Sequence, residues 1–203
     1  MKHLKNNQKA FTVIELLIAS TVFSVIILGA CVAIIQMTRL YYKGIIIQQT
    51  QTAARNLTQS IVQGIQYEGG SVSGITINGD VSYFEIGESR YTYAKNKQQN
   101  GSGTDAINHA MWKGAKSVDV GDLSTPTNGK DMLANNMRIT YLDVAEVGST
   151  NAPGLYKINV TVAYGDSDLF DDPSAPTSCK GNIAGSQWCA FVSYNTFAYR
   201  RNK

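Results

Sequence analysis

Few residues of this 203-residue chain have the types and spacing needed for chemistry at a site. Only two histidines occur, His3 and His109, and no recognisable nucleophile motif lies beside His109, so a catalytic dyad or triad is not indicated. Cys179 and Cys189 have no histidine near them in sequence, which argues against a zinc site. We therefore expect no enzymatic activity.

Four aspartates gather in the segment GDSDLFDDP, where their carboxylates could bind calcium. They are Asp166, Asp168, Asp171 and Asp172. Calcium takes oxygen ligands, and closely spaced carboxylates can supply several of them. The spacing does not match an EF-hand loop, however, and acidic loops are usually only solvated. Calcium binding here is a hypothesis, and no other metal or cofactor is predicted.

A single carboxylate, Glu15, stands at the start of a long apolar segment. The twenty residues from Leu16 to Ile35 carry no charge, and a helix of that length matches a hydrocarbon core about 30 Å thick. A carboxylate at the edge of such a span costs free energy unless it is paired or reaches the headgroups. Glu15 therefore either has a positive partner within the membrane or is tolerated at its boundary.

The charge of the chain is concentrated at its N-terminal tip. Of the 18 basic residues three lie in the first ten positions, and the 15 that remain balance the 15 acidic residues. A basic tip before an apolar span predicts that the N-terminus stays cytoplasmic and the rest is exported. With 16% charged and 43% hydrophobic residues, the remainder is neither a disordered chain nor a highly charged nucleic-acid binder.

Three interpretations of the apolar segment compete. A secretory signal has an apolar region of about 7–15 residues, whereas this run continues past Gly29 and Ala30. The sequence Leu28-Gly29-Ala30-Cys31 is typical of a lipoprotein signal that would make Cys31 the lipidated residue, but residues 32–35 stay apolar where a polar tether is expected. A retained transmembrane helix is favoured by length, with Cys31 as a small apolar residue in it.

The basic leader followed by Phe11-Thr12-Val13-Ile14-Glu15-Leu16-Leu17-Ile18-Ala19 resembles the class III leader of type IV pilins and pseudopilins. In that family a prepilin peptidase cuts before the Phe and methylates its new amine. The resemblance implies cleavage between Ala10 and Phe11 and N-methylation of Phe11, although the family usually has Gly where this chain has Ala10. It also implies an assembly role for Glu15, which would neutralise the amine of a neighbouring subunit. Such a pair fixes register because an unpaired buried charge is costly.

The resemblance implies a structural subunit, a minor pilin of a type IV pilus or related filament. The alternatives are a pseudopilin of a type II secretion or DNA-uptake system, and a membrane-anchored or lipidated surface binding module without a filament role. The implied partners are other pilin subunits, prepilin peptidase, the inner-membrane assembly platform and membrane lipid. The precursor would lie in the cytoplasmic membrane before it joins a cell-surface pilus or periplasmic filament.

Two features outside the leader bear on this expectation. Export places Cys179 and Cys189 where disulfides persist, and pilins often close a C-terminal loop in this way. The resemblance therefore implies a disulfide between them, stabilising by roughly 3 kcal/mol in the chain-entropy model. Basic residues interleaved with tyrosine can stack single-stranded nucleic acid, which makes DNA a weakly indicated partner. The residues concerned are Lys113, Lys116, Arg200, Arg201 and Lys203.

The periodicity of the chain predicts an α+β fold, a long N-terminal helix packed on an antiparallel β-sheet head. Ala54, Leu57, Ile61 and Ile65 recur at steps of three and four, so a continuous helix from Phe11 to Ile65 is expected, about 80 Å long. We divide the chain into a leader (1–10), a transmembrane and assembly helix (11–35), a helical stalk (36–66) and a globular β-rich head (67–203).

Alternating residues predict several strands in the head, of which Leu155–Tyr164 is the clearest. Two of them are expected to form a hairpin through the three residues Gly87-Glu88-Ser89. Residues 95–136 are interpreted as loops with one short strand near Val118. The expected strands are Val81–Ile86, Arg90–Ala94, Met137–Leu142, Leu155–Tyr164 and Trp188–Tyr199.

Overall fold

The computed structural model describes residues 11–68, 72–101, 105–116, 123, 128–147, 154–181 and 183–201. The chain divides into two compact units, Met1–Tyr41 and Tyr42–Lys203. Three of the features expected from the sequence lie outside the described residues: the leader, the short strand near Val118 and Lys203.

Helix α1, Val13–Tyr67, is the only α-helix among the described residues. All described residues of the first unit, Phe11 to Tyr41, are exposed, and most of them are apolar. By length and composition the helix is apolar enough to cross a membrane. Neither Gly29 nor Gly44 interrupts it, because a single glycine costs only about 1 kcal/mol in a helix interior.

In the second unit α1 buries one face. The buried positions follow the helical period because residues three and four apart lie on the same side. They are Ile46, Thr50, Ala54, Leu57, Thr58, Ile61, Gly64 and Ile65. Leu57, Ile61 and Ile65 join the main core, and burying each such side chain contributes about 1.5–3 kcal/mol. The periodicity of the sequence predicted this face correctly.

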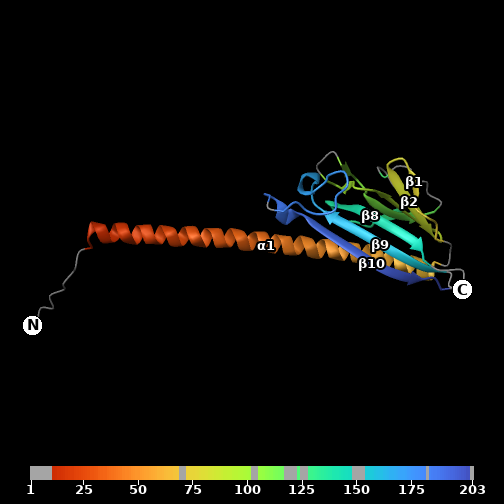
Figure 1. Ribbon diagram of the computed structural model, residues 1–203, viewed down its shortest axis with the longest axis horizontal. Helices are drawn as coiled ribbons and strands as arrows, with labels where there is room; N and C mark the ends of the chain where they lie inside the picture. The colour runs from red at the N-terminus through yellow and green to blue at the C-terminus, as the bar shows by residue number, and fades with distance from the viewer. Residues whose placement is uncertain are drawn as a thin grey trace, which may run out of the picture. The chain divides into compact units, whose positions relative to one another are not determined.

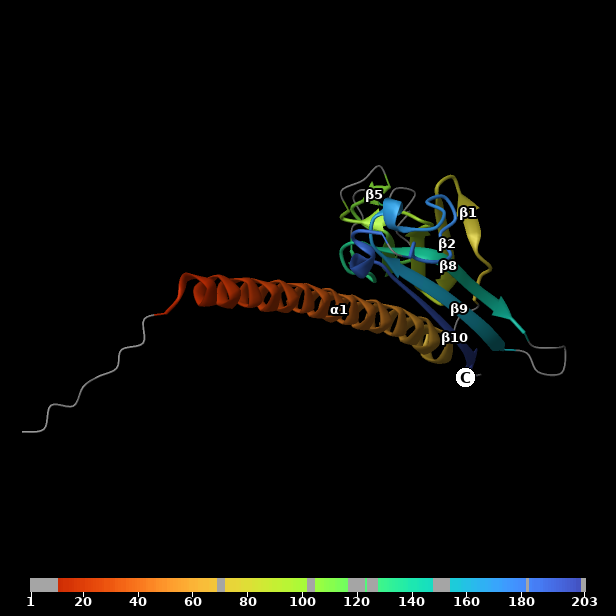
Figure 2. The same ribbon diagram turned by 60° about the vertical axis from the view of Figure 1, so that its left-hand side comes forward.

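The head contains two antiparallel sheets rather than the one expected. The first sheet, in spatial order, consists of β1 (Thr76–Asn78), β2 (Val81–Ile86), β3 (Ser89–Ala94), β6 (Met111–Ala115) and β7 (Gly129–Asp131). The second consists of β10 (Ala190–Tyr199), β9 (Leu155–Tyr164) and β8 (Met137–Glu146). Strands β8, β9 and β10 lie side by side along the second half of α1 (Figures 1 and 2). The α+β fold of a long helix on antiparallel strands is confirmed.

Short elements complete the head. Strands β4 (Gln98–Gln99) and β5 (Ala106–Ile107) form a small parallel pair. Two 3-10 helices, η1 (Ser167–Leu169) and η2 (Ser186–Trp188), lie on either side of residues 170–185. The main core forms where α1 meets both sheets, and it includes Phe84, Tyr91, Ile139, Ile158 and Val160.

The predicted hairpin exists, but its connection is one residue shorter than expected. Ile86 pairs with Ser89, so Gly87 and Glu88 alone form the turn. Gly87 has a φ of +57°, and a Cβ there would lie 2.9 Å from the carbonyl oxygen of Glu68. Two-residue hairpin turns favour glycine at the first position for this backbone conformation.

The interpretation of residues 95–136 as loops was wrong, because β4, β5, β6 and β7 fall within this range. Strand β6 pairs with β3 and buries Met111 and Trp112. The last strand begins at Ala190 and not at Trp188, because Trp188 ends η2. Strand β8 extends beyond the expected Leu142 to Glu146 because β9 offers a partner along its whole length.

Candidate assembly and processing site

Thr12 and Glu15 cap the start of α1. Thr12 lies directly before the first helical residue, and its backbone N–H donates to Glu15 Oε2 over 2.9 Å. The Thr12 hydroxyl also donates to Glu15 Oε2, over 2.8 Å, and accepts from the backbone N–H of Glu15 over 3.3 Å. This reciprocal arrangement is a capping box, with Thr12 as the N-cap and Glu15 three residues later.

The capping box gives Glu15 an intramolecular task that the sequence analysis did not consider. The first turn of a helix has backbone N–H groups without helical partners, and leaving them unpaired in lipid is costly. The signal that would have found Thr12 is the pattern Thr-x-x-Glu directly before an apolar run. Glu15 Oε2 accepts both hydrogen bonds that Thr12 donates to this side chain, and no described residue donates to Oε1. The carboxylate can therefore hold the cap and accept a further donor.

Phe11 precedes the cap and is 76% exposed. Ala10 lies outside the described residues. A cut between them would place the new amine one residue before the N-cap of α1, at the end of the helix where Glu15 lies. The structure thus brings Phe11, Thr12 and Glu15 together at one helix terminus, and the sequence had singled out only Phe11 and Glu15.

The expected disulfide between Cys179 and Cys189 is present, with the two Cα atoms 5.9 Å apart. Cys189 is buried beside Ala163, Leu169 and Phe170. The backbone around Cys179 is held as well, since Phe170 forms a β-bridge with it and Lys180 donates its N–H to the carbonyl of Leu169 over 2.8 Å. Cys31 is a free and exposed cysteine on α1.

Three of the four aspartates accept side-chain hydrogen bonds from different neighbours, and Asp168 accepts from Lys180 Nζ through its backbone carbonyl over 2.9 Å. Asp166 Oδ1 accepts from Gln98 Nε2 over 3.0 Å. Asp171 accepts from the N–H and hydroxyl groups of Thr177 and Ser178, and Asp172 accepts from those of Ser174. Among the described residues no three His, Cys, Asp or Glu side chains are placed to hold a metal ion, so calcium binding stays a prediction from the sequence.

The hydrogen bonds to Asp171 can be tested by measuring the pKa of its carboxyl group. The hydroxyl of Thr177, then the N–H groups of Thr177, Ser178 and Asp172, hold the pKa of Asp171 far below its usual range. Because the folded pKa is depressed, the bonds stabilise the fold above the unfolded pKa of about 3.9, and this contribution is lost as pH falls through the folded value. NMR titration of the side-chain carboxyl is expected to find Asp171 still ionised at a pH at which an ordinary aspartate has protonated.

Thr177→Val is expected to raise the pKa of Asp171 towards the ordinary value, because it removes the hydroxyl donor. Asp172 is the internal control. Its pKa is lowered chiefly by the hydroxyl of Ser174, so it should not move in this variant. An Asp171 that titrates normally in the wild-type chain would contradict this account of the loop.

Arg138 on β8 is a buried cation that the sequence analysis did not single out. Its side chain is fully buried, and burial lowers the pKa of Arg138, opposed by the charges of Asp105 and Asp166. Nη1 donates to the carbonyl of Asn96 over 3.1 Å and to the hydroxyl of Ser167 over 3.3 Å, and Nη2 donates to the carbonyl of Gly165 over 3.0 Å. Arg138 thereby ties β8 to the chain after β3 and to the segment that leads into η1.

Two of the lysines considered for nucleic-acid contact, Lys113 and Lys116, have carboxylate partners. Lys113 Nζ lies 3.0 Å from Glu68 Oε1, and Lys116 Nζ lies 3.0 Å from Glu85 Oε2. The guanidinium of Arg201 lies 5.8 Å from the centre of the Tyr67 ring. These contacts spread the basic residues over separate partners, so nucleic-acid binding stays a prediction that the geometry does not strengthen.

A family model for the prokaryotic N-terminal methylation motif matches residues 5–30. No curated protein and no solved structure matches the chain. The matched residues contain the expected cleavage position at Ala10 and Phe11, the capping pair Thr12 and Glu15, and the apolar run as far as Ala30. The chain therefore carries the N-terminal methylation motif of type IV pilins and pseudopilins on an apolar helix, and this motif and the β-rich, disulfide-bonded head together support a pilin-like protein.

Proposed function

We propose that the chain is a minor pilin, a structural subunit of a type IV pilus or related filament. The observation that carries the proposal is the first half of α1, whose apolar side chains are exposed along its whole length and whose first turn carries the capped carboxylate of Glu15. Such a surface needs lipid around it before assembly and other apolar helices around it afterwards.

In this proposal prepilin peptidase cuts between Ala10 and Phe11 and methylates Phe11. The new amine of one subunit is then neutralised by Glu15 of its neighbour in the filament. The capping box supports this step because it holds the carboxylate at the helix terminus and uses Oε2, with Oε1 facing no donor among the described residues. The assembly platform of the inner membrane would supply subunits from a membrane pool.

Mass spectrometry of the mature protein tests the processing step. The expected product begins at Phe11 and carries one methyl group on its amine, and it should appear only in cells with an active prepilin peptidase. A chain that keeps residues 1–10 in such cells, or that begins at a lipidated Cys31, would contradict the proposal. The second result would support the alternative of a lipidated surface module.

Analysis of pili sheared from the cell surface distinguishes a pilin from a pseudopilin. A pilin subunit is expected to co-purify with pili sheared from the cell surface, whereas a pseudopilin of a secretion or DNA-uptake system is expected to stay with the envelope fraction. We favour the pilus because the head carries two sheets and a disulfide-closed loop of its own, which gives it a distinct exposed surface.

A further inference from the structure

Trp188 is held firmly by its backbone while its side chain stays exposed. It closes η2, where its N–H donates to the carbonyl of Gly185 over 2.8 Å, and the next residue is the disulfide-bonded Cys189. Gly165, with a φ of +124°, lies so close that a Cβ there would be 2.8 Å from the carbonyl oxygen of Trp188. Despite these constraints 41% of Trp188 is exposed, so the fold presents this side chain at the surface rather than in the core.

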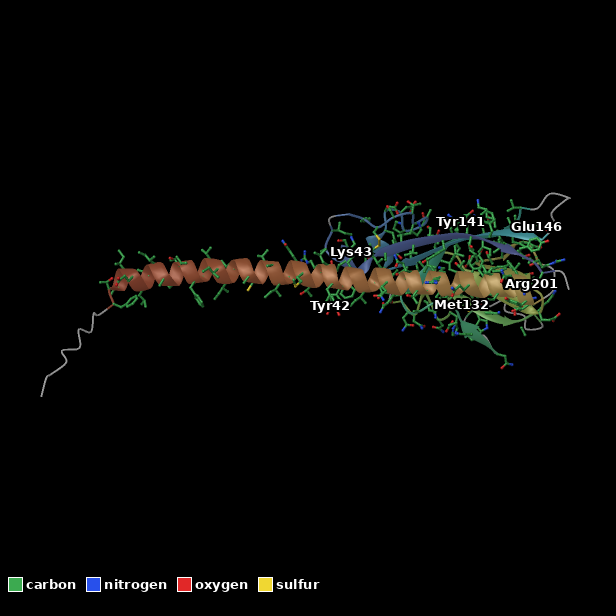
Figure 3. All side chains as sticks on the ribbon, turned by 90° about the horizontal axis from the view of Figure 1, so that it is seen from below. Tyr42, Lys43, Met132, Tyr141, Glu146 and Arg201 are labelled. Carbon is green, nitrogen blue, oxygen red and sulfur yellow. A yellow bond between two sulfur atoms is a disulfide. The ribbon has the colours of Figure 1, made fainter. Side chains whose placement is uncertain are left out.

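The partner of Trp188 on the helix is Tyr42. The two ring centres lie 5.0 Å apart with the planes tilted by 35°. Tyr42 is also 41% exposed, and Ile183 in the same disulfide-closed loop is 39% exposed. Lys43 follows Tyr42 on α1 (Figure 3). The pair therefore forms a half-exposed aromatic surface.

The position of Tyr42 along α1 indicates what this surface meets. The apolar run ends at Ile35, directly before Gln36, and the seven residues from Ile35 to Tyr42 correspond to about 10 Å of helix. The headgroup layer that begins at the end of an apolar span is roughly 5–8 Å thick, which the ring of a tyrosine or tryptophan can reach. Tryptophan and tyrosine are enriched in this layer because their rings are apolar with one polar atom.

We propose that Tyr42, Trp188 and Ile183 form a docking surface for the lipid headgroups of the membrane that α1 crosses. The proposal rests on the membrane span of the proposed function, and adds that the disulfide-closed loop of the head contacts the same bilayer before assembly. Two basic residues that flank Tyr42 in the sequence, Arg39 and Lys43, are exposed on α1 and complement anionic headgroups. The disulfide and Gly165 fix the loop so that Trp188 meets lipid without a further ordering cost.

Fluorescence quenching by brominated lipids tests the contact because the chain has only two tryptophans, Trp112 and Trp188. The full chain is placed in vesicles of phosphatidylcholine and phosphatidylglycerol with bromine at a shallow or at a deep acyl position. In Trp112→Phe, Trp188 is the sole tryptophan emitter, and bromine at the shallow position is expected to quench its emission more than bromine at the deep position. In the matched variant Trp188→Phe, Trp112 is the emitter; it is buried and should be quenched by neither lipid.

Equal emission of Trp188 in brominated and unbrominated vesicles would overturn the proposal and leave a second subunit as the occupant of this surface. If Trp112→Phe does not fold, the quenching of the wild-type chain minus that of Trp188→Phe gives the same quantity. The result is independent of the filament role. If Trp188 is not quenched in a chain that is correctly processed at Phe11, only the proposed lipid contact is contradicted. If Trp188 is quenched in a chain that never enters filaments, only the proposed pilin role is contradicted.

Discussion

Glu15→Gln is expected to abolish entry into filaments while the precursor is still inserted and processed before Phe11. Glutamine retains the side-chain oxygen that a capping box needs, so the cap of α1 with Thr12 should survive. What it loses is the charge that neutralises the neighbour's amine. An unpaired buried charge costs about 3–5 kcal/mol, so incorporation into sheared filaments should fall by at least roughly a hundredfold. Quantitative immunoblotting of sheared filaments and of membranes measures the fraction of subunits that is incorporated.

Two companion variants separate pairing from capping. Thr12→Ala removes the hydroxyl of the cap and keeps the charge of Glu15, at a cost of about 1 kcal/mol, so it should reduce incorporation far less than Glu15→Gln. Glu15→Ala removes both and should be at least as defective as Glu15→Gln. The matched control is Thr21→Val, because the Thr21 hydroxyl donates only within the helix, to the carbonyl of Ile18 over 2.8 Å.

The relative severity of the assembly defects in these variants distinguishes the two roles of Glu15, pairing with a neighbouring amine and capping the helix. If Thr12→Ala and Glu15→Ala fail while Glu15→Gln assembles like the wild type, the carboxylate acts as a helix cap and the pairing with a neighbouring amine is wrong. Normal processing in all variants is required for either conclusion, and the mass of the membrane-bound chain reports on it.

The helix and the longest strands could be predicted from the sequence because their signals are local. The spacing of Leu57, Ile61 and Ile65 is set by the helical period, and the alternation in Leu155–Tyr164 by the pleat of a strand. Strand β6 gave no such signal. It has only five residues, includes Gly114, and owes its existence to pairing with β3 across residues that are distant in sequence.

The site was predictable in part for a similar reason. Glu15 stood out because a charge at the edge of an apolar run is unusual, while Thr12 was overlooked although its capping pattern is equally local. Arg138 could not have been found in this way. A cation in a strand ordinarily faces solvent, and its burial follows from three carbonyl and hydroxyl groups that other parts of the chain bring together.

Arg138→Ala is expected to cause the largest loss of stability of any single substitution considered for the head. The guanidinium has bonds to Asn96, Gly165 and Ser167, and lies 3.8 Å from the carboxylate of Asp105. Removing one partner of a buried charged network costs about 3–5 kcal/mol because the groups left behind stay desolvated. For a domain of this size the midpoint of thermal unfolding should fall by roughly 6–20 °C.

Thermal unfolding of the detergent-solubilised full chain, followed by tryptophan fluorescence, measures this shift. Arg55→Ala is the matched control, since Arg55 is exposed on α1 and its loss should change stability by no more than about 0.5 kcal/mol. Arg138→Lys keeps the charge but not the planar set of guanidinium donors, so its midpoint temperature should lie between those of Arg138→Ala and Arg55→Ala. If Arg138→Ala unfolds at the same midpoint temperature as Arg55→Ala, the buried network does not contribute to the stability of the head.

The same variant should also loosen the disulfide-closed loop. Gly165 and Ser167, which Arg138 holds, lie directly before the segment that carries Cys179 and Trp188. Without the guanidinium, limited proteolysis is expected to cut within residues 166–188 faster than in the wild type, with the disulfide still intact. If the proposed lipid contact exists, Trp188 in the Arg138→Ala background should also be quenched less by shallow bromine, because a Trp on a mobile loop spends less time at the headgroups.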